Sequence, residues 1–148
     1  MHSYSIPKQL VYAAWLKVKA KGGVAGADNV SIDIFEQDEK NELYKLWNRM
    51  SSGSYMAPPV KRVEIAKSDG KLRPLGIPTV ADRVAQMVVK MTLEPEWDHK
   101  FHSYSFGYRP KRSAHQAVQA AKINCWKYSW VIDLDIKGFF DNLNHDQL

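Results

Sequence analysis

SWVIDLDIKGFFD, residues 129–141, places two carboxylates inside an apolar run. The β-branched and aromatic residues from Trp130 to Ile136 favour a β-strand. Side chains alternate along a strand, so Asp133 and Asp135 would share one face. A carboxylate at the point where a strand becomes a loop is well placed to bind a hard cation such as Mg²⁺, which prefers oxygen ligands. On this pattern alone, a surface carboxylate at a strand end remains the alternative interpretation of Asp135.

Composition indicates one globular, basic domain. The chain has 148 residues, of which 45% are hydrophobic, and its net charge is +5. A basic balance favours an anionic partner, nucleic acid first. The single cysteine, Cys125, excludes an internal disulfide and a cysteine-rich zinc site, and we expect it at a packed helix end. We expect a cytoplasmic protein, because one cysteine suits a reducing compartment and the N-terminal residues do not resemble a signal peptide. We expect no membrane partner, because no apolar run approaches the roughly 18 residues that a membrane span needs.

The first sixty residues predict two helices separated by a turn. Ser5 can cap the first helix, and the glycine-rich segment GGVAGADN, residues 22–29, ends it. Ser31 is a second cap candidate. The next helix ends at Gly53, and its apolar side chains follow helical spacing: Leu43, Leu46, Trp47 and Met50.

Residues 60–77 predict a β-hairpin. Val63 and Ile65 alternate with charged residues, and Asp69-Gly70 is a strong hairpin turn signal. The strands and the surrounding helices together predict an α+β fold. Within this hairpin, the spacing leaves the register open.

Two registers place different partners opposite Arg73. A two-residue turn puts Ala66 there, whereas a three-residue loop puts Lys67 there. Two facing cations repel, so the second register makes sense with an anion between them. A solvated tip with ordinary lysines is the alternative interpretation.

The remainder of the chain predicts two more helices. Thr79 and Asp82 form a loose capping box before a stripe that Pro95 would close: Val84, Met87, Val88 and Met91. Ser113 and Gln116 form another capping box before a small-residue face suited to close helix packing: Ala114, Ala117, Val118 and Ala121.

Three stretches resemble the fingers and early palm of a bacterial reverse transcriptase of the group II intron type. They are VEIAKSDGKLRPLGIPTVADRVAQ, LEPEWDHKFHSYSFGYRPKRSAHQAV and WVIDLDIKGFFDNLNHDQL, in that order. The glycine-rich segment at 22–29 also resembles the family's, although Asn29 stands where a glycine is usual. The resemblance implies a right-hand polymerase with fingers and an N-terminal helical extension in residues 1–128. Residues 129–148 would begin the palm with its first strand.

The resemblance assigns site residues one by one. Asp135 matches the first catalytic aspartate, which binds both Mg²⁺ ions, and the carbonyl of Ile136 would be a further metal ligand. Lys67 and Arg73 match the cations that grip the incoming triphosphate. Phe140 matches the bulky residue that excludes a ribose 2′-OH and so selects deoxynucleotides.

The implied partners are an RNA template, a DNA primer, a dNTP and intron RNA. Arg62, Arg109, Lys111 and Arg112 would contact the nucleic-acid backbone. Exposed aromatic side chains also predict self-association of the chain.

The chain contains no Asp-Asp pair, which the family's second catalytic motif supplies. We therefore expect a fragment of a longer enzyme that does not polymerise by itself. An RNA-binding module without catalysis and a small basic domain that joins other proteins remain alternatives. The sequence does not separate an intron-encoded enzyme from a relative in a defence or CRISPR-associated system.

Overall fold

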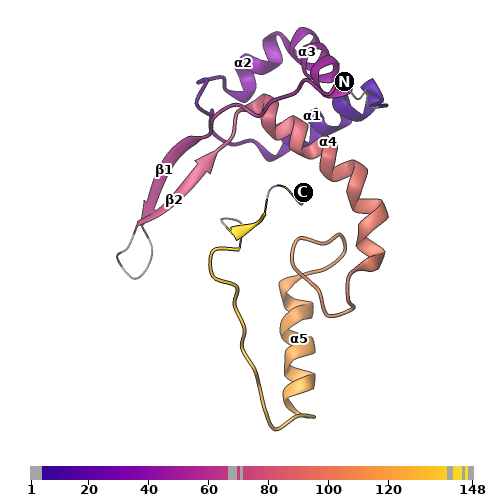
Figure 1. The fold of residues 1–148 in the computed structure, drawn as a ribbon, viewed down its shortest axis with the longest axis vertical. Helices are drawn as coiled ribbons and strands as arrows, with labels where there is room; N and C mark the ends of the chain where they lie inside the picture. The colour runs from indigo at the N-terminus through magenta and orange to yellow at the C-terminus, as the bar shows by residue number, and fades with distance from the viewer. Residues whose placement is uncertain (1–4, 67–69, 71, 140–141, 145, 147–148) are drawn as a thin grey trace. The chain divides into compact units, whose positions relative to one another are not determined.

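The computed structural model describes residues 5–66, 70, 72–139, 142–144 and 146. In these residues five helices and two strands follow one another, with one turn of 3-10 helix, Asp98–Lys100. The chain forms two compact units, Met1–His99 and Lys100–Leu148, which are described separately. The elements, labelled in Figure 1, are α1 (Lys8–Lys21), α2 (Ile32–Gln37), α3 (Glu39–Ser51), β1 (Lys61–Ala66), β2 (Leu72–Ile77), α4 (Val80–Trp97) and α5 (Ala114–Cys125).

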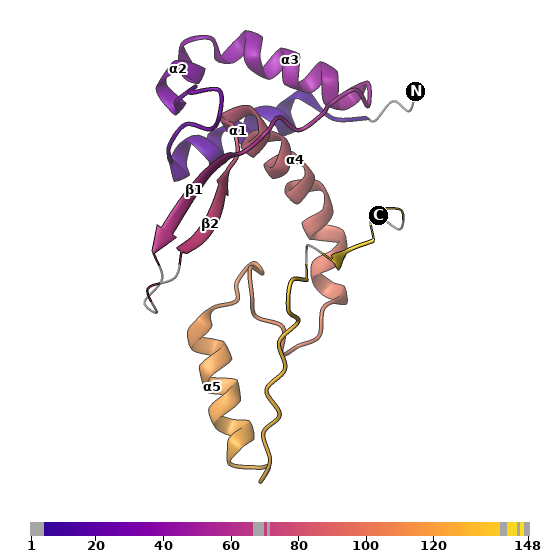
Figure 2. The same cartoon turned by 60° about the vertical axis from the view of Figure 1, so that its left-hand side comes forward.

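The core of the first unit lies where α1 and α4 pack together, and both views show these helices side by side (Figures 1 and 2). Trp15 is completely buried and its ring lies 4.7 Å from that of Phe35, while its Nε1 donates a 3.0 Å hydrogen bond to Glu39. The predicted apolar stripes of α3 and α4 are confirmed, because their residues are buried or pack against the core. The buried hydrophobic residues are Val11, Ala14, Trp15, Val18, Phe35, Leu46, Met50, Val80, Val84, Ala85 and Val88.

Three of the four predicted helix caps are confirmed. The hydroxyls of Ser31, Thr79 and Ser113 each accept a hydrogen bond from a backbone N–H in the first turn of their helix. The prediction for Ser5 is wrong, because Pro7 is the N-cap of α1. Its backbone is extended and its carbonyl starts the helix, so a residue without an N–H is tolerated there.

Helix α4 does not stop at Pro95, as the sequence predicted, but continues to Trp97. A proline forfeits one backbone hydrogen bond and crowds the carbonyl four residues earlier. This close to the C-terminal end few further bonds depend on that turn, so the helix continues for two residues. Among the described residues, no helix is long and apolar enough to cross a membrane.

Strands β1 and β2 form an antiparallel two-stranded sheet, the predicted hairpin. Ala66 pairs with Leu72 at its end, and Arg73 lies opposite Ile65. Both predicted registers are therefore wrong, because the pairing is shifted by one residue from that of the two-residue turn and by two residues from that of the three-residue loop. All residues of the two strands are exposed except Ile77, which is half-buried, and the hairpin projects from the helices of its unit (Figure 1). Within β2, Pro74 lies opposite Glu64.

The second unit has no buried residue among those described. Helix α5 has no buried residue, and only Ala117, Ala120 and Asn124 are half-buried, so the predicted close packing of its small-residue face is not found. Cys125 is exposed rather than packed. Residues 130–136 form no strand. A strand needs a neighbour for its backbone hydrogen bonds, and the described part of the chain supplies none. The predicted boundary between residues 128 and 129 separates fingers from palm by their roles in a polymerase. A division of the chain into compact units does not test those roles.

Candidate functional site

One face of the hairpin combines an exposed cation with apolar side chains. The register places Arg73 on the same face as Val63, Ile65 and Leu75, and all four are exposed. An exposed guanidinium on a projecting hairpin can bind a phosphate through two parallel hydrogen bonds. Lys67, its predicted companion, lies outside the described residues.

The opposite face of the hairpin carries Arg62. Its Nη2 lies 3.4 Å from Oε1 of Glu64, two residues along the same strand. Such an exposed ion pair contributes little and is easily exchanged for another anion. Arg62 therefore remains accessible to a nucleic-acid phosphate.

The predicted metal-binding segment is fully accessible. Asp133, Asp135 and Ile136 are exposed on the irregular stretch that follows α5. In the part of the chain that the structure describes, no group of three or more His, Cys, Asp or Glu side chains could hold a metal ion. Asp135 thus supplies one carboxylate, and Mg²⁺ needs further ligands from elsewhere. Phe140 lies outside the described residues.

Arg109 organises the connector between α4 and α5. Its Nη1 donates 3.0 Å hydrogen bonds to the carbonyls of His102 and Ser105, and its guanidinium lies 5.3 Å from the ring centre of Phe101. These contacts hold the connector in shape. If Arg109 also binds nucleic acid, its guanidinium must do so while it keeps these contacts within the connector.

The other two predicted backbone-contacting cations are exposed. Arg112 lies 5.6 Å from the ring centre of Phe106, and Lys111 has a left-handed backbone with φ of 59°. Tyr108, three residues before Lys111, is also left-handed and fully exposed. Non-glycine residues in this conformation are uncommon and cluster at functional sites. Exposed cations and an exposed ring within one short segment are suited to phosphates and bases.

A polar network that the sequence interpretation missed lies at the start of α4. The buried carboxylate of Asp82 accepts a 2.7 Å hydrogen bond from the hydroxyl of Tyr55 and a 2.8 Å hydrogen bond from Nε2 of Gln86. Burial, and then the hydrogen bond to Asp82, raises the pKa of Tyr55 above its ordinary value. The capping box was the available signal, but sequence alone did not show that Tyr55 would reach it.

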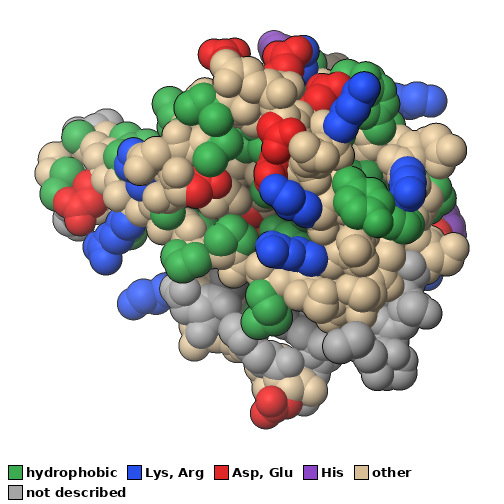
Figure 3. All heavy atoms as spheres, turned by 90° about the horizontal axis from the view of Figure 1, so that it is seen from above, with side chains coloured by type: hydrophobic (Ala, Val, Ile, Leu, Met, Phe, Trp, Pro, Cys, Tyr) green, Lys and Arg blue, Asp and Glu red, His purple; other side chains and the backbone are tan. Residues whose placement is uncertain are grey.

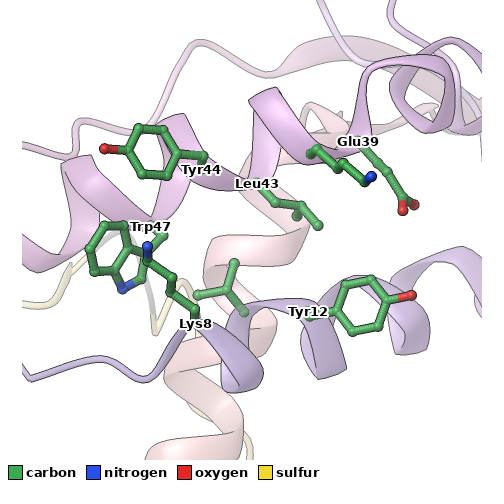
Figure 4. A pocket seen from close by; sticks show the side chains of 8 residues that line it. Lys8, Tyr12, Glu39, Leu43, Tyr44 and Trp47 are labelled. Atoms are coloured by element: carbon green, nitrogen blue, oxygen red, sulfur yellow. The ribbon is translucent and has the colours of Figure 1, made fainter.

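A shallow pocket of about 420 Å³ lies between α1 and α3 (Figure 4). The ammonium of Lys8 lies 4.3 Å from the ring centre of Trp47 and 5.3 Å from that of Tyr44.

On the face seen in Figure 3, acidic, basic and hydrophobic side chains are interspersed. The net charge of +5 is therefore not gathered into one basic field on this face.

The helices and the small antiparallel sheet are consistent with the fingers region of a polymerase. The chain belongs to the reverse transcriptase (RNA-dependent DNA polymerase) family, whose model matches residues 65–148. The match includes β2, α4, α5 and Asp135. The resemblance inferred from the sequence is thereby confirmed.

Similar proteins specify the type of reverse transcriptase. The chain is 39% identical over 94% of its length to Protein YkfC of Escherichia coli, of which it covers 38%. It is 32% identical over 98% of its length to the group II intron-encoded protein LtrA of Lactococcus lactis, of which it covers 24%. It is 30% identical over 95% of its length to the putative COX1/OXI3 intron 2 protein of Saccharomyces cerevisiae, of which it covers 16%. The names of these relatives confirm the resemblance to reverse transcriptases of the group II intron type. The chain spans less than two fifths of the length of each of them.

Proposed function

We propose that the chain forms the fingers and the start of the palm of an RNA-directed DNA polymerase of the group II intron type. The observation that carries the proposal is the family match, which includes the carboxylate of Asp135 and most of the hairpin. In this proposal the partners are an RNA template, a DNA primer, a dNTP and intron RNA.

In the proposed reaction, a primer 3′-hydroxyl attacks the α-phosphate of a dNTP in line. Asp135 and the carbonyl of Ile136 would hold Mg²⁺, which would supply activation of the hydroxyl and stabilisation of the leaving pyrophosphate. Arg73, with Lys67, would neutralise the triphosphate, and Phe140 would exclude a ribose 2′-OH by its bulk. Arg62, Arg109, Lys111 and Arg112 would bind phosphates of the template and primer.

The test of the metal role is Asp135→Asn in the full-length protein, measured by primer extension on an RNA template. We expect activity to fall by at least about a hundredfold while RNA affinity is kept, because the lost group stabilises charge only during reaction. Asp133→Asn is the matched control, since it makes the same change two residues away on an equally exposed position. Equal activity of the two variants would contradict the role of Asp135.

The test of the nucleotide role is Arg73→Ala in the same protein. Losing a charge-assisted pair with phosphate should raise the KM for dNTP by roughly 10- to 100-fold. Arg62→Ala, on the opposite face of the hairpin, should weaken RNA binding in a salt-dependent manner and leave the KM for dNTP unchanged. A KM that does not respond to Arg73→Ala would remove this residue from the nucleotide site.

The same assay tests the 148-residue chain by itself. It carries no Asp-Asp pair, and one carboxylate does not hold two metal ions in reacting geometry. We expect no magnesium-dependent extension product. RNA binding without extension would support the module alternative for the isolated chain.

A further inference from the structure

The glycine-rich loop that follows α1 is attached to the start of α4. Arg83 donates a 3.1 Å hydrogen bond from Nη1 to the carbonyl of Gly22 and a 2.8 Å hydrogen bond from Nη2 to the carbonyl of Val24. Its Nε is buried and, among the described residues, has no hydrogen-bond partner. The guanidinium is therefore held against the loop, with its Nε buried and the residue as a whole half-buried. Its rigid fork suits two carbonyls two residues apart, which one ammonium group matches poorly.

The loop has room for Arg83 because Gly23 has no side chain. A Cβ at Gly23 would lie 2.6 Å from Nη1 of Arg83, and its φ of +114° disfavours other residues. Two features therefore require glycine at position 23: its backbone conformation and the position of the Arg83 guanidinium.

Gly26 brings the loop against the backbone that joins β2 to α4. Gly26 is buried, and a Cβ there would lie 2.7 Å from both N and Cα of Thr79 and 2.9 Å from the carbonyl carbon of Pro78. Backbone atoms cannot move aside as the end of a flexible side chain can. Any larger residue at Gly26 must push the loop away from the connection.

This connection is the base of the hairpin. Every residue of the two strands is exposed except Ile77, the last residue of β2, which is half-buried. Contacts along the strands therefore restrain the hairpin weakly, and its direction depends on Pro78, Thr79 and whatever packs on them. Gly26 packs there, and Arg83 holds the loop that contains it.

We infer that Arg83 and Gly26 are positioning residues for the nucleotide site. They clamp the loop of residues 22–26 onto the base of the hairpin and so fix where Arg73 meets the triphosphate. This inference rests on the proposed function of Arg73. Neither residue touches the nucleotide, so both act through the direction of the hairpin.

The test compares Arg83→Ala, Arg83→Lys and Gly26→Ala in the full-length protein, by dNTP titration in primer extension. Because small misplacements of a binding group are costly, we expect the KM for dNTP to rise about tenfold or more in each, with kcat and RNA affinity within about threefold. Arg83→Lys keeps the charge but not the fork, so its failure to restore KM would separate hydrogen-bond geometry from charge. Amide exchange of residues 22–26 should become faster in all three.

Two controls separate positioning from folding. Gly107→Ala meets no heavy atom within 4 Å and should change nothing. Val88→Ala removes methyl groups from a core position on α4 that is 1% exposed, so it should lower the melting temperature without raising KM. If Val88→Ala raises KM as much as Arg83→Ala does, loss of stability explains the effect and the inference is overturned.

Arg73→Ala measured in parallel distinguishes this inference from the proposed function. No change in KM for Arg73→Ala means that the proposed nucleotide role fails. A raised KM for Arg73→Ala together with unchanged values for all three clamp variants means that the hairpin is oriented without the clamp, and the inference alone fails.

Discussion

Removing the carboxylate of Asp82 should destabilise the first unit more than its single negative charge suggests. Asp82 is 5% exposed and accepts two hydrogen bonds, from Tyr55 and Gln86. A hydrogen bond to a charged group contributes about 1.5–3 kcal/mol, and we assign Gln86 less, about 0.5–1 kcal/mol, because its exposed amide can turn to water. A carboxylate in the first helical turn adds about 0.3–1 kcal/mol. Removing the carboxylate also removes the free-energy cost of burying a charged group, which offsets part of this sum. We therefore expect Asp82→Ala to lower the free energy of unfolding by about 2–3 kcal/mol.

Urea unfolding of the 148-residue chain, followed by circular dichroism, measures this loss. A typical slope of roughly 1–3 kcal/mol per molar urea converts this loss to a midpoint lower by about 0.7–3 M. Asp33→Ala is the matched control, because Asp33 is also in the first turn of a helix but is exposed. A double-mutant cycle with Tyr55→Phe should give a coupling energy of about 1 kcal/mol or more. Equal midpoints for Asp82→Ala and Asp33→Ala, or additive changes in the cycle, would refute the reasoning.

Three further changes test the same fold. The raised pKa of Tyr55 means that the folded chain keeps a proton that the unfolded chain loses above pH 10, so stability falls as pH rises beyond that value. In urea titrations, the difference in free energy of unfolding between the unmodified chain and Tyr55→Phe should therefore shrink above pH 10. A difference that stays constant with pH would contradict the burial of the Tyr55 hydroxyl. Ser31→Ala removes the cap of α2 and should cost about 1 kcal/mol, whereas an unchanged midpoint would show that water replaces the cap. Val84→Ala leaves a cavity at a completely buried position and should lower the free energy of unfolding by about 2–3 kcal/mol. Val118→Ala, at an exposed position on α5, should change it by no more than about 0.5 kcal/mol. Similar losses for the two variants would mean that α5 is packed in solution.

Local patterns in the sequence predicted most elements of the first unit and the start of α5 in the second. Ser31, Thr79 and Ser113 were predictable as caps, because capping depends on residues three positions apart. The stripes of α3 and α4 were predictable for the same reason. The end of α4 was not, because a proline near a C-terminus costs too few hydrogen bonds to decide where the helix stops.

Long-range features were the ones that the sequence did not predict. The Asp69-Gly70 signal predicted a hairpin, but the observed pairing lies one or two residues away from the registers that the signal suggested. The strand at 130–136 depends on a partner strand, and its residues alone show only the propensity. Tyr55 with Asp82, and Arg83 with the loop carbonyls, join residues 27 and about 60 positions apart, which no local spacing indicates. Site assignments at Asp135 and Arg73 came from the family resemblance rather than from spacing.

Pro74 in β2 disfavours the addition of another strand to the open edge of the hairpin. A two-stranded sheet leaves both outer edges open, and exposed Val63, Ile65 and Leu75 would favour the addition of another strand there. Pro74 has no N–H and fits in a strand where its nitrogen points outward, so the open edge of β2 lacks a donor near its middle. The open edge of β2 is thereby made a poor partner for a strand of another copy of the chain, although the residues of this hairpin are exposed.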